Sequence, residues 1–159
     1  MTTQTFNAII HKLTKAERKE LLEKLKEQYG IKEIDGELIK IGAERIRLFT
    51  GELEEKEYES ILSTIWIEGI GVSILKEEKD GWRISIEGAQ ALKEQITKNI
   101  SELEDKNLGP WMHGEDIQQK NEQKGFVVMK NKNDLLGAGK LGAEKVSNYI
   151  PKERRLKHK

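Results

Sequence analysis

This sequence of 159 residues contains no cysteine, only two prolines and few aromatic residues. The absence of cysteine excludes a disulfide framework, a thiolate zinc site, an iron–sulfur cluster and a cysteine nucleophile. It also suits a reducing compartment, so the cytoplasm is the expected location. The longest apolar stretches, 61–67 and 70–75, are well short of the roughly 20 residues that a membrane-spanning helix requires, and no membrane association is expected. The N-terminus lacks the pattern of a signal peptide.

Net charge is also absent, because 28 Lys and Arg balance 28 Asp and Glu. The two signs are unevenly distributed along the chain. Residues 120–159 hold 11 basic and 4 acidic residues, a net charge of +7, whereas residues 1–119 hold 17 basic and 24 acidic residues, a net charge of −7. Such asymmetry indicates a polyanionic partner, although a solvated, charged surface would produce the same count.

The composition is that of a very polar globular protein, with 36% hydrophobic and 35% charged residues. A chain of this length can bury a core as one domain or as two small domains packed together. The N-terminal part alternates helix and hairpin patterns. Thr14 and Glu17 have the spacing of a capping box, and Asp80-Gly81 is a strong hairpin signal. The expected elements are a helix over 14–30, a hairpin of 38–41 and 45–49, a helix over 54–65, a hairpin of 72–75 and 82–86, and a helix over 88–99. This order predicts an α+β domain over residues 1–98.

The C-terminal part is expected to form a smaller β module over residues 99–159. The acidic stretch 101–110, which ends in Gly109-Pro110, is interpreted as the turn into this module. The elements expected after it are a short helix over 115–120, a hairpin within 126–141 and a final strand over 146–150. Several short strands with one short helix favour a compact, barrel-like fold.

Two motifs in this module resemble small-molecule or metal sites. Residues 137–142 have the form G-x-G-x-x-G, but neither a following helix nor an acidic residue about 20 positions later is present, so a dinucleotide cofactor is not expected. His113, Glu115 and Asp116 stand close enough in sequence to chelate a metal. Acidic residues in the first turn of a short helix are the simpler interpretation, since they suit the helix dipole. We expect no metal and no cofactor.

Basic and aromatic residues in the same module favour RNA binding. Cations contact phosphates, and flat side chains stack on exposed bases. Phe126 is expected in the core, whereas Trp111 and Tyr149 are expected to be half exposed. The basic set is Lys130, Lys132, Lys140, Lys145, Lys152, Arg154, Arg155, Lys157 and Lys159.

Four segments of this module resemble a PUA domain, the RNA-binding fold of pseudouridine synthases and archaeosine transglycosylases. They are 109–117 (GPWMHGEDI), 125–129 (GFVVM), 136–139 (LGAG) and 148–155 (NYIPKERR). The N-terminal part is similar to the pre-PUA domain of Nip-seven-type ribosome biogenesis proteins, and the whole chain to short archaeal proteins of the NOL/NOP/Fmu family. RNA cytosine methyltransferases of the wider group carry a Rossmann domain with catalytic cysteines. This chain has neither, so no catalytic residue is expected.

The resemblance implies an α+β protein in which an N-terminal pre-PUA domain packs on a C-terminal PUA-like β-barrel. RNA would lie against the glycine loop and short helix from Gly114 to Lys120, Lys140 and the basic C-terminus. Glu115 and Asp116 depart from the neutral or basic surface expected there. The RNA-binding residues expected are Trp111, Gly114, Lys120, Lys130, Lys132, Lys140, Lys152, Arg154, Arg155 and Lys157.

We therefore expect a cytoplasmic, archaeal RNA-binding protein without catalytic activity that acts in ribosome assembly or rRNA maturation. Its partner is expected to be structured rRNA or tRNA, and ribosome assembly proteins are expected to dock on the acidic N-terminal domain. Two alternatives stay open. One is a protein-interaction adaptor that uses the N-terminal domain, and the other is a small metal-dependent enzyme at His113, Glu115 and Asp116.

Overall fold

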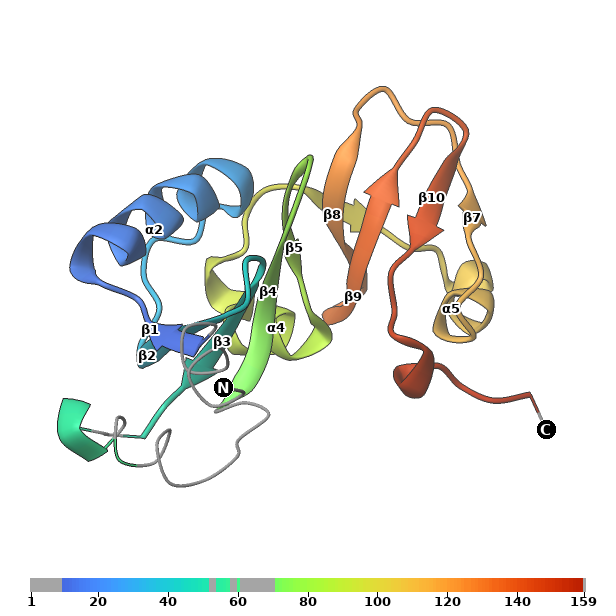
Figure 1. The fold of residues 1–159 in the computed structure, drawn as a ribbon. Coiled ribbons are helices and arrows are strands. Elements are labelled where there is room, and N and C mark those ends of the chain that lie inside the picture. The colour runs from blue at the N-terminus through green and yellow to red at the C-terminus, as the bar shows by residue number, and fades with distance from the viewer. Residues whose placement is uncertain (1–9, 52–53, 58–59, 61–70, 159) are drawn as a thin grey trace.

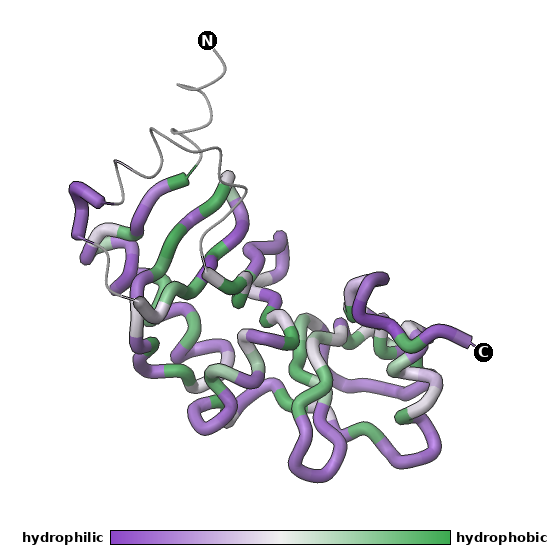
Figure 2. Tube along the Cα trace, turned by 90° about the horizontal axis from the view of Figure 1, so that it is seen from below, coloured by the Kyte–Doolittle hydropathy of each residue, from purple (hydrophilic) through white to green (hydrophobic). Residues whose placement is uncertain are grey.

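The computed structural model describes residues 10–51, 54–57, 60 and 71–158, which form two halves with one five-stranded sheet each (Figure 1). Hydrophobic residues are concentrated along the strands of both halves, and hydrophilic residues occupy the turn tips and the C-terminal end (Figure 2). None of the helices in this described part has the length and apolar composition of a membrane span. The α+β fold class is confirmed.

The N-terminal sheet has its strands in sequence order, and every neighbouring pair is antiparallel. Both predicted hairpins are confirmed; the second turns at Lys79-Asp80, and Gly81 is already the first residue of the returning strand, where it pairs with Glu78. The first strand was not predicted, because three residues are too few to show an alternating pattern. The strands are β1 Ile10–Lys12, β2 Glu37–Ile41, β3 Arg45–Phe49, β4 Val72–Glu78 and β5 Gly81–Ile84.

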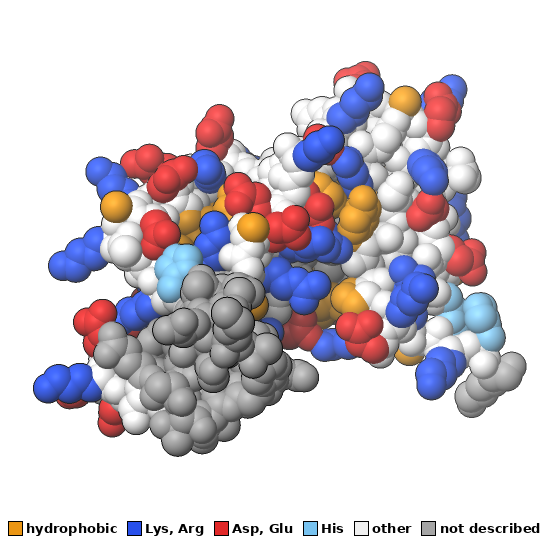
Figure 3. All heavy atoms as spheres, in the orientation of Figure 1, with side chains coloured by type: hydrophobic (Ala, Val, Ile, Leu, Met, Phe, Trp, Pro, Cys, Tyr) orange, Lys and Arg blue, Asp and Glu red, His pale blue; other side chains and the backbone are white. Residues whose placement is uncertain are grey.

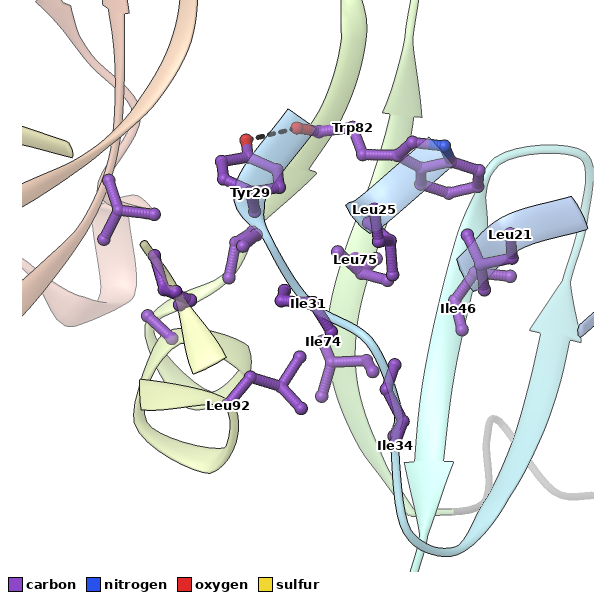
Figure 4. Close-up of a cluster of buried hydrophobic side chains, with 14 of the residues drawn as sticks. Leu21, Leu25, Tyr29, Ile31, Ile34, Ile46, Ile74, Leu75, Trp82 and Leu92 are labelled. Carbon is purple, nitrogen blue, oxygen red and sulfur yellow. Dashed lines mark hydrogen bonds between the residues drawn. The ribbon is translucent and has the colours of Figure 1, made fainter. Parts of the chain in front are cut away.

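Helix α2 (Lys15–Tyr29) covers this sheet and begins and ends as the sequence predicts. The Thr14 and Glu17 side chains form the reciprocal capping box, and Gly30 ends the helix in the left-handed conformation, with a φ of 84°. Leu25 and Tyr29 are fully buried, and the Tyr29 hydroxyl donates a hydrogen bond to the Trp82 carbonyl (Figure 4). Burial raises the pKa of Tyr29, so the phenol stays protonated and keeps this bond.

The predicted helix over 88–99 is shorter than expected. Helix α4 spans only Ile86–Ala91 and is followed by the 3-10 helix η1 (Lys93–Gln95). The chain leaves the α conformation because it must turn into strand β6 (Ile100–Glu102), and Asn99 adopts a φ of 52° just before that strand. Most of the helix predicted over 54–65 lies outside the described residues; residues 55–57 within it are helical.

The C-terminal sheet has the order β6-β8-β9-β10-β7. Its central hairpin and last strand are confirmed as predicted. Strand β6 pairs parallel to β8, and the other neighbours are antiparallel. The remaining elements are β7 Ile117–Gln118, β8 Gly125–Asn131, β9 Asp134–Leu141, β10 Lys145–Asn148, helix α5 Asp105–Met112 and the 3-10 helix η2 Lys152–Arg154.

Two predictions at the start of this half are wrong. The acidic stretch 101–110 is not a turn, because it forms the end of β6 and most of α5. The short helix lies at Asp105–Met112 rather than at 115–120, where β7 is found instead. Burial explains both errors: Leu103 and Trp111 enter the core of this half and hold the chain regular around them. Pro110 fits within α5 because a proline near the end of a helix removes only one hydrogen bond.

The two halves share hydrophobic core. On β8, Val127 and Met129 enter the C-terminal core, whereas Val128 enters the N-terminal core. Successive residues of a strand point to opposite faces, so β8 is covered on both sides. Leu135 of β9 also enters the N-terminal core, and Gln90 of α4 donates a 2.9 Å hydrogen bond to its carbonyl. The halves are therefore packed as one body.

This shared core predicts that Leu135→Ala destabilises both halves together. Removing a buried leucine side chain costs about 2–5 kcal/mol of unfolding free energy. Urea unfolding followed by residue-resolved amide NMR signals should show both sheets losing structure at one lowered midpoint. Leu156→Ala is the matched control, because Leu156 is 55% exposed and should leave the midpoint unchanged. Separate midpoints for the two sheets would contradict this shared core.

Candidate nucleic-acid interface

A groove of about 590 Å³ lies between the two halves. One wall comes from the N-terminal sheet and the start of α4, and the other from β9, the end of β10 and the η2 segment. Figure 3 shows Lys and Arg side chains of both halves around the hollow between them. Six cationic side chains line this groove against only two carboxylates, Glu87 and Glu153. The cations are Arg45, Lys76, Arg83, Lys152, Arg154 and Arg155.

Arg83 and Tyr149 contact each other in the groove lining. The Arg83 guanidinium carbon lies 5.0 Å from the centroid of the half-buried Tyr149 ring, in a cation–π contact. One guanidinium nitrogen of Arg83 is 3.1 Å from a carboxylate oxygen of Glu78. Its Nε is buried and has no hydrogen-bond partner within the described part of the chain. A buried donor without a partner is costly, so the fold holds Arg83 here at the expense of an unmade hydrogen bond.

Two of the predicted RNA contacts instead join the halves. Arg154 forms an ion pair with Glu87 of α4, and Lys140 of β9 forms one with Asp80 in the β4–β5 turn. The hydrogen bond from Lys140 holds the pKa of Asp80 below its usual value, and the Asp80 carboxylate raises the pKa of Lys140 in return. Both pairs join the two halves, and Arg154 and Glu87 also line the groove.

Gly114 and Arg155 also have a structural function. Arg155 Nε donates a 2.9 Å hydrogen bond to the Ile150 carbonyl. Gly114 has a φ of 93°, and a Cβ there would stand 2.4 Å from Arg155 Cδ. The glycine thus leaves room for the arginine, and the loop and the C-terminal segment lie against each other.

The remaining predicted cations divide into two groups. Lys130 and Lys132 lie next to carboxylates at the β8–β9 turn, with Nζ–oxygen distances of 3.9 Å to Glu102 and 3.3 Å to Asp105. The second group is exposed and has no ion pair in the region that the structure covers: Lys120, Lys152 and Lys157. This second group is the part of the predicted set that is open to phosphate.

The expectation that Trp111 is half exposed is wrong. Its side chain is fully buried in the C-terminal core, and the indole N–H donates a 3.2 Å hydrogen bond to the Leu136 carbonyl. Gly139 makes room for the ring, because a Cβ there would lie 3.1 Å from it. Trp111 cannot stack on a base without leaving the core. Tyr149 is half-buried as predicted, and Phe126 is in the core as predicted.

His113, Glu115 and Asp116 are not arranged around a common point. His113 Nδ1 lies 2.7 Å from the Leu156 carbonyl oxygen, and its ring stacks on His158 with centroids 4.2 Å apart. Asp116 accepts a 2.7 Å hydrogen bond from Lys145 and a 2.9 Å bond from the Asn148 backbone N–H. Among the described residues, no group of three or more His, Cys, Asp and Glu is placed to hold a metal.

Sequence reasoning missed the cations of the N-terminal wall. Arg45, Lys76 and Arg83 belong to residues 1–119, which carry a net charge of −7, so a count over that stretch conceals them. A signal was present in the sequence. Arg45 and Arg47 alternate with apolar residues in a predicted strand, which places both arginines on one face of the sheet.

The bonds of Asp116 predict a dependence of stability on pH. The hydrogen bond from Lys145, then that from the Asn148 backbone, lowers the pKa of Asp116. A lowered folded-state pKa adds stability above the unfolded value of about 3.9, and this stability is lost as the pH falls through the folded value. Asp116→Asn should therefore reduce the loss of stability below about pH 4, measured by urea unfolding across an acid series. The control variant Asp134→Asn removes an exposed carboxylate at the start of β9. It should lose as much stability in acid as the wild type does. An unchanged curve for Asp116→Asn would contradict this assignment.

Comparison with known proteins concerns mainly the C-terminal half. The family described as the methyltransferase RsmF PUA domain matches residues 98–156. Ribosomal RNA small subunit methyltransferase F of Vibrio cholerae is 24% identical over 149 residues, which is 93% of this chain and 30% of the relative. The enzyme of the same name from Vibrio vulnificus is 26% identical over 60% of this chain. That from Aeromonas salmonicida is 29% identical over 53% of this chain. The chain spans about a fifth to a third of the length of these relatives.

These relatives correct two expectations. The prediction of a protein without catalytic activity is wrong on this comparison, because the relatives are named as rRNA methyltransferases. They are bacterial, so they do not support the archaeal, Nip-seven-type assignment. The predicted fold is confirmed: the chain is an α+β protein with two sheets, and its C-terminal half contains a PUA domain.

Proposed function

We propose that this protein binds structured small-subunit rRNA and takes part in its methylation. The observation that carries the proposal is a match to a PUA domain beside a groove lined by six cations, one of which is the exposed Lys152 of that domain. PUA domains are an RNA-binding fold, and phosphates attract clustered cations irrespective of sequence. The relatives named as small-subunit rRNA methyltransferases supply the class of RNA and the reaction.

Within this proposal the chain is divided at the sequence-predicted boundary, into residues 1–98 and 99–159. The C-terminal module makes the first phosphate contacts through Lys120, Lys152 and Lys157, which are exposed and unpaired among the described residues. Phosphate contacts fix position, and the shape of the RNA selects the site. The acidic N-terminal module is left to contact ribosome assembly proteins, and the cytoplasm is the compartment in which this RNA is found.

The RNA-binding part of the proposal predicts that Lys120→Glu with Lys157→Glu weakens binding to purified small-subunit rRNA. Two lost phosphate contacts should lower the slope of log affinity against log salt by about 1.4 to 1.8. Filter binding across a salt series measures both quantities. Lys15→Glu with Lys19→Glu on α2 is the control, since it removes the same charge from exposed helix positions. We avoid Arg154 and Arg155 because their substitution would also disturb internal contacts. Failure of the wild-type chain to bind this rRNA would refute the proposal.

The methylation part predicts a missing mark in cells. Small-subunit rRNA from cells that carry only the Lys120→Glu, Lys157→Glu protein should lose most of one methylated nucleotide, detected by mass spectrometry of rRNA fragments. Cells with the Lys15→Glu, Lys19→Glu protein should keep that nucleotide methylated. If methylation is identical in both kinds of cells and in cells without the protein, the methylation part of the proposal is contradicted. The RNA-binding part would still stand.

A further inference from the structure

Three cations form a row across the N-terminal sheet. Arg45 of β3 is the register partner of Lys76 of β4, and Lys76 is in turn the partner of Arg83 of β5. Partners in an antiparallel pair lie on one face, and like charges directly opposite each other destabilise a sheet. All three side chains line the groove between the halves. The repulsion among these three cations therefore lowers the stability of the N-terminal sheet.

Nearby glutamates reduce this cost only in part. Lys76 Nζ is 3.5 Å from carboxylate oxygens of both Glu44 and Glu78, and Glu78 also contacts Arg83. The Glu44 side chain is 59% exposed, so water and salt weaken its attraction for the lysine. Arg45 has no ion pair in the part of the chain that the structure describes. Cations held together in this way are arranged to meet an anion.

The opposite wall supplies a place for a base. The Tyr149 ring lies on that wall, 5.0 Å from the guanidinium carbon of Arg83 on the facing wall, and bases stack on both aromatic rings and guanidinium planes. Lys152 stands on the same wall without an ion pair among the described residues, so phosphates on either side of the base would meet cations.

We propose that the groove binds a single-stranded segment of the RNA, with phosphates on Arg45 and Lys76 and a base beside the Arg83–Tyr149 pair. This inference rests on the proposed function and identifies the part of the RNA that is recognised. The volume of about 590 Å³ falls within the range of about 300–1,000 Å³ typical of small-ligand sites, which suits one or two nucleotides. Bases accessible in this way come from loops, bulges and ends, because paired bases stay stacked in the helix.

The first test replaces Arg45 and Lys76 by glutamine in the full chain. This variant removes two phosphate contacts and also the like-charge repulsion across β3 and β4. We expect at least about a tenfold loss of affinity for small-subunit rRNA at low salt and a salt slope shallower by about 1.4, together with an unfolding midpoint equal to or above that of the wild type. Lys15→Gln with Lys19→Gln on α2 is the matched control and should bind within about twofold of the wild type.

The second test locates the bound nucleotide. RNA transcribed with 4-thiouridine is crosslinked to the protein, and the crosslinked peptide and nucleotide are identified by mass spectrometry and reverse transcription. We expect crosslinks in the peptide that holds Tyr149, at unpaired nucleotides, and their loss in Tyr149→Leu.

The outcomes separate this inference from the proposed function. Wild-type binding to rRNA with unchanged affinity for Arg45→Gln, Lys76→Gln would overturn the groove site and leave the proposed function standing. Crosslinks only to paired nucleotides, or only to peptides outside the groove, would also overturn the groove site and leave the proposed function standing. Absence of rRNA binding by the wild type would overturn both. Weaker binding of the groove variant with crosslinks to unpaired nucleotides at Tyr149 would support both.

Discussion

The arrangement of this molecule depends on the burial of the β8–β9 hairpin from both sides. Val127 and Met129 of β8 pack into one core, and Val128 between them packs into the other. A strand covered on both faces must be apolar at successive positions, which explains the uninterrupted run from Phe126 to Met129. Because this hairpin contributes to both cores, the two sheets hold a fixed relation to each other. A linker alone would leave their relative positions free.

That fixed relation creates the groove. Its walls come from segments more than 50 residues apart in the chain, and the pairs Arg154–Glu87 and Lys140–Asp80 join the two halves. These pairs are partly exposed, so water and salt weaken the attraction within each pair. The apolar contacts therefore contribute most of the stability of the interface between the two halves. The ion pairs help to orient one half against the other. Some of the charged residues that the sequence predicts to bind RNA therefore form ion pairs within the protein, and the others are exposed to solvent.

The predictions that succeeded were those based on local patterns. The capping box at Thr14, the β4–β5 turn at Lys79-Asp80 and the apolar β8–β9 hairpin each specify a short-range structure through steric and hydrogen-bonding rules that act within a few residues. The predictions that failed depended on burial. Gly109-Pro110 has the composition of a turn, and Trp111 has polar neighbours in sequence, yet all three residues lie in helix α5, because Trp111 is buried with Leu103 and Val127 in the core.

The sequence by itself determined the α+β class, the polarity between an acidic N-terminal and a basic C-terminal part, and the resemblance to a PUA domain, because composition and local spacing are properties of the chain alone. Only the tertiary structure decided which cations are available. Arg45, Lys76 and Arg83 are far apart in sequence and become neighbours through strand register, and Arg155 turns inward to a carbonyl although it stands in a basic tail. Coulomb interactions act over distances in space, and a count of charges along the chain cannot show those distances.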